Sequence, residues 1–426
     1  MEVGKYVNAN RSKKTSTKFK AERTFHEVTH NPPTARPNDT LTVNVPKIKD
    51  LLIVPGTLAL TFDLDIVLDP AEPGNSVNTY PINNLSANII SRIIIKIGST
   101  PVFDLDYAHL YNTYKDLWLT EKQRKNAVFK GIQNEELRKM RTDLRASLSN
   151  PRESNVALKN VYGKRYLLPL GLELINDHVS LPTWDIEDDI VFELTINTKE
   201  YVLKYNRDKG ATVNFTMNNI CLQYETLDSP DLKNQIVKQL EFGFPFLFDH
   251  VQHYRKKEIS KNDTLLTEDV NVHRKSLKGI LLLFQNEFKE GERDSEQFPN
   301  PQITNVKFTI GTPNKLYNTG YKMPHQWGEI CRYFISEDFK NGHDSFMDIE
   351  KYYGDNKFAL WIDFRSTEDN DLHGAGKEQD SKQSIAMEIT KKDTSESSDG
   401  KLFMHIYIVS DARLVNQNKK FGKLEI

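Results

Sequence analysis

Apolar and polar residues alternate along most of this chain, and the alternation is clearest between Leu58 and Leu68. Every second residue there is apolar, whereas the positions between them include Thr61, Asp63 and Asp65. Because successive side chains of a strand point to opposite faces, the pattern predicts a strand with one buried face. Similar alternation recurs in six further segments, at residues 192–196, 213–217, 220–224, 306–310, 358–364 and 402–408. Short alternating segments between turn-rich loops indicate an all-β chain of antiparallel sandwiches or barrels.

A few segments break the alternation with the spacing of helices. In residues 107–118 apolar side chains recur every three or four positions, which predicts a helix with one buried face. Residues 120–123 (TEKQ) have the pattern of a capping box and predict the start of a second helix. A helix is also predicted over residues 229–240, where we place the junction between two domains, and a short one around residues 327–334.

One phrase occurs twice, at the end of a predicted strand in each half of the chain. The first copy is residues 95–101 (IKIGSTP) and the second is residues 308–313 (FTIGTP). Gly98 and Gly311 lie 213 positions apart, which is half of the 426-residue length. Such internal repetition predicts two similar β domains in tandem, and the chain is long enough for two separate cores.

Composition narrows the function classes. The net charge of −2 gives no general reason to expect nucleic-acid binding, and no apolar run approaches the roughly 20 residues of a membrane span. The amino terminus lacks the apolar core of a secretory signal. Cys221 and Cys331 lie in apolar stretches without paired spacing, so we expect buried thiols in a reducing compartment.

The first 25 residues depart from this balance. They carry seven basic side chains and two acidic ones among few apolar residues, which predicts an arm that is disordered alone and docks on an anionic or protein surface. A solubilising tail is the alternative interpretation. The residues that we assign to an assembly contact on the inner surface are Lys13, Lys14, Lys18, Lys20 and Arg23.

Catalytic motifs give little reason to expect an enzyme. His26-Glu27-Val28-Thr29-His30 matches the H-E-x-x-H pattern of zinc proteases, which needs a helix that continues through both histidines. Asn31-Pro32-Pro33 follows directly and disfavours that helix, so we expect an extended segment. His250 and His253 lie on an alternating segment and are expected to be structural. We expect no catalytic residues, no cofactor and no metal site.

Several segments resemble, in their order along the chain, double jelly-roll (hexon-like) major capsid proteins. Three lie in the first half and two in the second, the last accompanied by residues 373–376 (HGAG). The similarity is to the Polinton (Maverick) and adintovirus-like lineage of eukaryotic double-stranded DNA viruses and extends over nearly the whole chain. The segments are residues 29–35 (THNPPTA), 52–58 (LIVPGTL), 110–120 (LYNTYKDLWLT), 274–280 (RKSLKGI) and 360–366 (LWIDFRS).

The resemblance implies two eight-stranded antiparallel jelly-roll sandwiches in tandem, with short helical insertions. We expect a basic arm at residues 1–38, a first jelly roll at 39–228 and a second at 229–426. By the same resemblance, homotrimers of pseudo-hexagonal outline would tile an icosahedral viral shell. Their partners would be neighbouring trimers, penton and minor capsid proteins and, at the inner surface, the genome or a membrane. The location would be the virion, assembled inside the host cell.

A jelly roll also suits proteins of other classes. A carbohydrate-binding, lectin-like protein is the main alternative, because a shallow sugar site leaves little trace in one sequence. A cupin-like enzyme would need clustered histidine and glutamate ligands, and the histidines here do not have that spacing.

Overall fold

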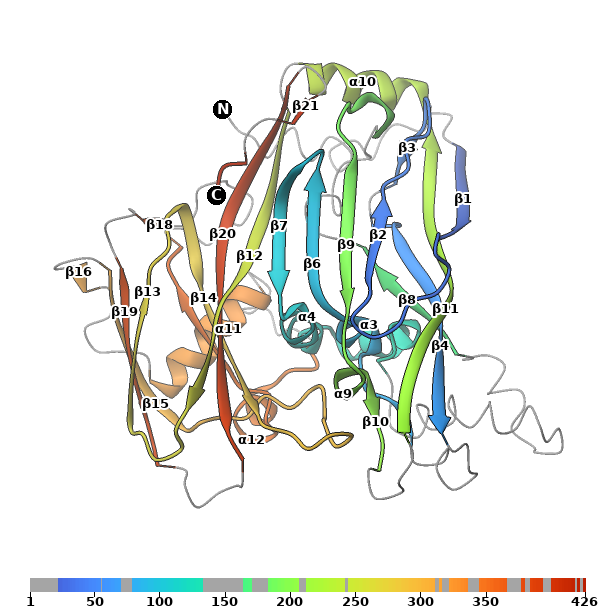
Figure 1. Cartoon of the computed structure of the whole chain (residues 1–426). Coiled ribbons are helices and arrows are strands. Elements are labelled where there is room, and N and C mark those ends of the chain that lie inside the picture. Colours follow the sequence, from blue (N-terminus) through green and yellow to red (C-terminus); the bar gives the residue numbers. More distant parts are fainter. Residues whose placement is uncertain are drawn as a thin grey trace.

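The fold is taken from a computed structural model of the whole chain (Figure 1). The structure describes residues 22–54, 56–69, 79–132, 164–170, 183–206, 212–241, 244–310, 314–315, 322–335, 345–365, 377–379, 384–393, 400–417, 420–421 and 424–426.

The first half of the chain forms a sandwich of two antiparallel sheets. One sheet has the order β1-β11-β4-β8, with the short β3 beside β11, and the other has the order β2-β9-β6-β7. A small β5–β10 pair lies beside them. The strands are β1 Glu22–Thr29, β2 Thr40–Asn44, β3 Leu52–Ile53, β4 Ala59–Asp69, β5 Tyr80–Pro81, β6 Ile90–Ile97, β7 Thr100–Asp106, β8 Arg165–Pro169, β9 Ile190–Ile196, β10 Leu203–Lys204 and β11 Thr212–Asp228.

The second half repeats this arrangement. Its sheets have the orders β12-β20-β14-β17 and β13-β19-β15-β16, and the short β18 and β21 extend the first of them. The strands are β12 Phe244–Ile259, β13 Leu265–Val270, β14 Arg274–Asn286, β15 Ile303–Ile310, β16 Asn314–Lys315, β17 Ala359–Asp363, β18 Lys377–Gln379, β19 Ile385–Lys391, β20 Leu402–Gln417 and β21 Lys420–Phe421.

The two halves have the same eight-stranded jelly-roll order, which confirms the predicted fold class. In each half the first, last, third and sixth principal strands form one sheet, and the second, seventh, fourth and fifth form the other. The repeated phrase occupies equivalent places. In the first half it lies in the β6–β7 hairpin, where Gly98 adopts a positive φ of 59°. In the second half it begins in β15, and residues 311–313 lie outside the described residues.

The helices follow the predicted positions. The segments at 107–118, 120–123, 229–240 and 327–334 all correspond to helices, and Thr120 and Gln123 form the predicted capping box. The bounds are α3 Leu85–Asn88, α4 Ala108–Leu117, α5 Glu121–Asn126, η1 Ala127–Lys130, η2 Thr183–Asp185, α9 Lys199–Val202, α10 Pro230–Glu241, α11 Met323–Phe334 and α12 Ile349–Gly354. None of the described helices is long and apolar enough to cross a membrane. Helices α4 and α11 follow equivalent hairpins of the two jelly rolls, β6–β7 and β15–β16.

The chain enters the first jelly roll earlier than expected. Residues 22–29, which we placed in the arm, form β1, and this strand pairs along its whole length with β11. The pairing explains why the zinc-protease pattern is not helical, because His26 lies within a strand. The expected extended conformation of that motif is confirmed.

Candidate functional site

The two jelly rolls contact each other through their equivalent helices, α4 and α11. The hydroxyl groups of Tyr111 on α4 and Tyr333 on α11 lie 3.0 Å apart in a hydrogen bond. Next to them, the ring of Trp118 stacks on Phe334 with centroids 5.1 Å apart and planes inclined by 6°. Trp118 also stacks on Trp327 at 5.8 Å. Aromatic stacking of this kind adds to the burial of large apolar surfaces, so the helix pair holds the two halves together.

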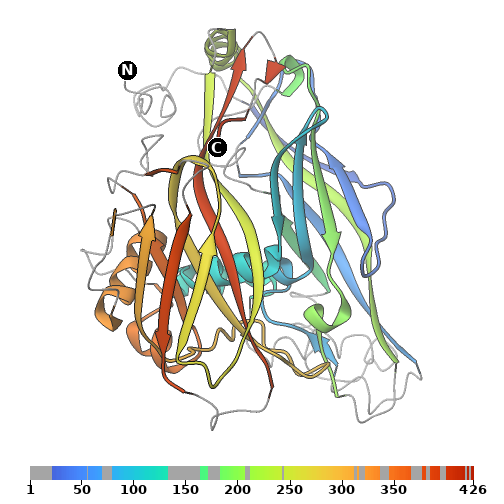
Figure 2. The same ribbon diagram turned by 60° about the vertical axis from the view of Figure 1, so that its left-hand side comes forward.

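Both helices lie against one face of the β12-β20-β14-β17 sheet (Figure 2). Trp361, Leu281 and Tyr407 form a row across β17, β14 and β20, and all three are fully buried. Trp361 stacks on Tyr333 with ring centroids 3.9 Å apart, and the Tyr407 hydroxyl donates to the Tyr107 carbonyl at 3.0 Å. The sheet is therefore covered on both faces, on one side by its partner sheet and on the other by helices.

The loop between β14 and β15 adds polar contacts to the first jelly roll. The Arg293 guanidinium, 3% exposed, donates to the Asn88 side chain at 2.9 Å and lies over the Tyr201 ring. Arg124 on α5 pairs with Glu296 at 2.7 Å, where both side chains are nearly buried. Breaking a buried ion pair leaves an uncompensated charge, so these contacts oppose any separation of the halves.

A group of histidines lies at the same contact. His405 Nδ1 and His253 Nε2 are 3.2 Å apart, and both rings pack on Tyr107, with centroids at 4.8 and 4.6 Å. His109, on α4, is 2% exposed and lies beside the Tyr107 and Tyr201 rings. Helix α4 and strands β12 and β20 thus bring together three imidazoles that are distant in the sequence.

Burial keeps these imidazoles neutral. Desolvation lowers the pKa of His253 to about 4 and that of His405 to about 2. It also lowers the pKa of His250, which packs edge-on against Phe103, to about 4. The pKa of His109 is lowered well below its usual value by burial and then by the Arg293 charge. The ring contacts make the cluster part of the packing between the jelly rolls. The described residues contain no group of metal-ligating side chains arranged to hold an ion.

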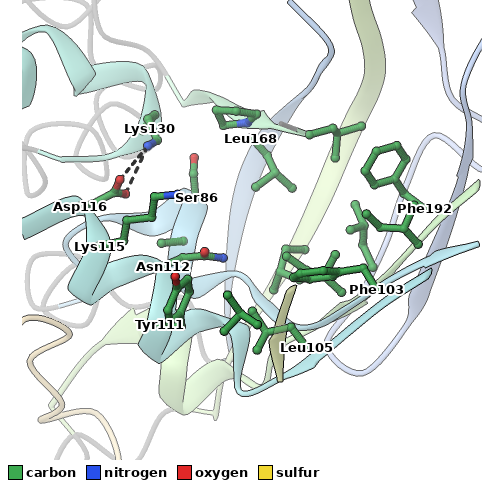
Figure 3. Close-up of a pocket in the computed structure, with 18 of the residues that line it drawn as sticks. Ser86, Phe103, Leu105, Tyr111, Asn112, Lys115, Asp116, Lys130, Leu168 and Phe192 are labelled. Carbon is green, nitrogen blue, oxygen red and sulfur yellow. Dashed lines mark hydrogen bonds and ion pairs between the residues drawn. The ribbon is translucent and has the colours of Figure 1, made fainter. Parts of the chain in front are cut away.

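A cavity of about 270 Å³ lies in the first jelly roll, close to the same contact (Figure 3). Its apolar part is lined from β6, β7, β8 and β9, and β12 of the second jelly roll closes one side. Its polar part is lined by Asn112, Lys115 and Asp116 of α4 and by Lys130 of η1. Lys130 pairs with Asp116 at 3.1 Å.

Most of the residues predicted for the arm lie outside the residues that the structure describes. Lys13, Lys14, Lys18 and Lys20 lie outside the described residues. Arg23 lies on β1, where it pairs with Glu225 of β11 at 2.8 Å. His26 of the zinc-protease pattern contacts Thr226 and stacks on Tyr224, while His30 contacts the carbonyls of Pro32 and Thr42.

Three solved structures of viral capsids resemble this chain over most of its length. The "PBCV-1 virus capsid, quasi-atomic model" matches with a TM-score of 0.60 and 13% identity, covering 95% of this chain and 96% of the other. This chain has the double jelly-roll fold. The Sputnik virophage structure matches with a TM-score of 0.58 and 10% identity, covering 95% and 88%. The mavirus major capsid protein matches with a TM-score of 0.53 and 8% identity, covering 94% and 89%.

The double jelly roll is evident in the structure rather than in sequence similarity. No protein-family model and no curated protein sequence matches the chain. At 8–13% identity the likeness to these structures is a likeness of fold.

Proposed function

We propose that this double jelly roll is a viral major capsid protein that forms homotrimeric capsomers of pseudo-hexagonal outline. The observation that carries the proposal is the fixed side-by-side placement of two sandwiches with the same strand order. Three such subunits about one axis place six similar jelly rolls in a ring. Such rings can tile an icosahedral shell, because one patch builds the trimer and other patches join trimers.

Two further features support a role in assembly. Eight principal strands in each half are closed into sandwiches, which limits uncontrolled pairing of strand edges in a protein made in many copies. The solved structures that it resembles come from viral capsids, which supports a structural role in the virion over the sugar-binding alternative. The partners would be neighbouring trimers and the penton and minor capsid proteins. We propose no enzymatic activity.

We also propose that the basic arm contacts the inner surface of the shell. Lys13, Lys14, Lys18 and Lys20 would face neighbouring trimers, minor proteins, the genome or a membrane, whereas Arg23 belongs to β1. Since β1 begins at Glu22, we assign residues 1–21 to the arm and residues from 22 to 228 to the first jelly roll. The second jelly roll then follows α10.

The mass in solution tests the capsomer. Size-exclusion chromatography with light scattering of the purified chain should give about 148 kDa, three times the chain mass of 49.2 kDa. Negative-stain images of that species should have a hexagonal outline. A stable monomer at physiological salt would contradict the proposal, and a glycan array would then test the alternative function.

Deletion of residues 1–20 tests the arm without removing any of β1. The deleted protein should still form trimers and should fail to form normal shells when co-expressed with its minor proteins. A matched variant with Lys13, Lys14, Lys18 and Lys20 replaced by glutamine separates charge from chain length. Normal shells from both variants would refute the assigned role of the arm.

A further inference from the structure

The cavity in the first jelly roll lies between the two sheets, where a sandwich ordinarily has side chains packed together (Figure 3). Ile95, Phe103, Leu105 and Phe192 line it, and each side chain is at most 5% exposed. These residues come from three adjacent strands of one sheet, whereas Leu168 of β8 comes from the opposite sheet. The walls of this part of the cavity are therefore apolar and buried.

The volume of the cavity exceeds that of an ordinary packing gap. Protein interiors hold few voids larger than a water molecule, whose share of liquid volume is about 30 Å³. The volume here is about 270 Å³. It is just below the usual range of small-molecule sites, roughly 300–1,000 Å³, which favours a slim alkyl chain over a ring system. A bound chain would restore the contacts that the wall residues lack across the empty space.

The charged residues that line the cavity are already engaged within the protein. Asp116 of α4 pairs with Lys130 of η1 at 3.1 Å. Asp249 of β12 pairs with the buried Lys278 ammonium at 2.5 Å. Lys115 of α4 is likewise engaged. A charged ligand would therefore lose its hydration without gaining a counter-ion from the described residues of the lining, which favours an uncharged ligand.

One uncharged polar side chain of the lining remains for a ligand. Asn112 lies on α4, one turn before Asp116, at the polar end of the cavity (Figure 3). Its amide has no hydrogen-bond partner among the described residues, whereas the Ser86 hydroxyl donates to the Leu167 carbonyl at 2.6 Å. An amide can donate to a hydroxyl oxygen and can also accept the hydroxyl hydrogen. A single hydroxyl group on the ligand therefore suits this end.

We propose that this cavity binds an uncharged amphiphile of the medium-chain alkyl alcohol class, with its chain between the sheets and its hydroxyl at Asn112. The alkyl chain needs only contact with the apolar walls, whereas a sugar would leave most of its hydroxyl groups without partners. Phe248 and Val251 of β12 line one side of the cavity. The bound chain therefore also packs on the second jelly roll and should stabilise the folded subunit.

Two ligands of equal chain length test the chemical class. 1-Octanol titrated into the full-length protein by isothermal calorimetry at neutral pH should bind to the wild type. Octanoate should bind at least about tenfold more weakly, because its carboxylate would be desolvated without a free counter-ion. Octanoate that binds as tightly as octanol would overturn the uncharged class. No heat from octanol up to its solubility limit would reject the site.

Filling the apolar part tests where the chain lies. Ile93 of β6 lines the cavity, and its neighbour Ile94 does not and points to the other face of the strand. Ile93→Trp should weaken octanol binding at least tenfold, and the matched Ile94→Trp should change it less than twofold. Circular dichroism checks that both variants fold. Loss of binding in both folded variants, or in neither, would overturn the assignment.

Removing the amide tests the position of the hydroxyl and leaves the apolar walls intact. Asn112→Leu should weaken octanol binding about fivefold, the order expected from one neutral hydrogen bond. Asn126→Leu at the exposed end of α5 is the matched control and should change the affinity less than twofold. An affinity of Asn112→Leu equal to that of the wild type would overturn the proposed orientation, whether or not the filled variant folds.

Octanol binding is independent of capsid assembly. It is measured on the purified chain in whatever oligomeric state the chain has, so a failed trimer test leaves the site standing. The absence of octanol binding would reject the site even if hexagonal capsomers were observed.

Discussion

The two equivalent sheets, β1-β11-β4-β8 and β12-β20-β14-β17, have the same strand order and opposite surroundings. The outer face of the first carries ion pairs, with Arg165 3.1 Å from Glu27 and 3.6 Å from Asp63. The corresponding face of the second carries Trp361 and Tyr407, both fully buried beneath the helices. The outer face of the first sheet therefore lies at the surface of the subunit. The second sheet instead lies between its partner sheet and the helices.

The order of the strands and the burial of their outer faces therefore depend on different features of the sequence. Strand β4 alternates buried apolar residues with polar ones, as a sheet with one wet face requires. Strand β14 is continuously buried from Ser276 to Gln285, as a strand covered on both faces requires. The same topology therefore serves an outer wall in one jelly roll and an inner wall in the other.

The largest expected effect comes from Trp361 in the covered sheet. Trp361→Ala should lower the free energy of unfolding by about 3–5 kcal/mol, because it opens a cavity beneath Tyr333. Val67→Ala on β4, where the side chain is 49% exposed, should change it by less than about 0.5 kcal/mol. Urea denaturation followed by tryptophan fluorescence and far-ultraviolet circular dichroism measures both. Similar losses in the two variants would mean that the sheets do not differ as described.

Acid should weaken the covered sheet through its histidines. Because the pKa of His253 is lowered to about 4 and that of His405 to about 2, the unfolded chain takes up protons first as the pH falls below about 6.5. The contribution of these two imidazoles to stability should be constant above that pH and should fall by up to about 3 kcal/mol for each of them between pH 6.5 and pH 4. Denaturation measured at both pH values gives the loss. In the double variant His253→Gln and His405→Gln, the loss should be smaller, and an unchanged loss would exclude these imidazoles as its cause.

Gly279 of β14 tests at a single position how tightly the second sheet is covered. A Cβ atom there would lie 2.3 Å from the Trp361 ring and 2.5 Å from the Ile362 carbonyl oxygen. Gly279→Ala should therefore cost about 2 kcal/mol through overpacking. Gly328→Ala on α11 is the matched control, because among the described residues nothing beyond its chain neighbours and the helix's own backbone lies within 4 Å of the new Cβ. It should stabilise the helix by about 0.5–1 kcal/mol. Thermal denaturation should move in opposite directions for the two variants.

The smallest expected effect concerns the helix contact that covers the second sheet. Tyr111→Phe and Tyr333→Phe each remove one hydroxyl of a single hydrogen bond. A double-mutant cycle should give a coupling energy of about 1 kcal/mol between the two positions. Chemical denaturation of the wild type, both single variants and the double variant supplies the four values. Strict additivity would show that the hydroxyl pair does not couple the helices.

Much of the fold could be predicted because it follows from local patterns. The alternation near Phe62, the capping box at Thr120 and the repeated turn at Gly98 are each decided by neighbours in the sequence. The apolar run at Ile280–Phe284 is harder to assign from the sequence, because a short continuous run does not distinguish a strand covered on both faces from a buried helix. The strand at Glu22 was assigned to the arm, since its few apolar residues do not alternate.

The contact between the jelly rolls could not be predicted from such patterns. His109 and His405 come together only when a helix of the first half packs on a strand of the second, across nearly 300 positions of sequence. Each histidine by itself resembles an ordinary structural residue. The cavity likewise depends on spacing between sheets, which no single strand records.

The contact between the jelly rolls limits how the chain can be cut into two separate pieces. A backbone break at Ser229, between β11 and α10, would leave two pieces held together where α4 of the first packs on α11 and β20 of the second. Each piece alone would expose its own side of this contact to water, Tyr111 and Trp118 on the first piece and Tyr407 and Phe334 on the second, and would aggregate. When the two pieces are co-expressed, they should associate into one noncovalent subunit. Neither piece should be obtained as a folded protein by itself.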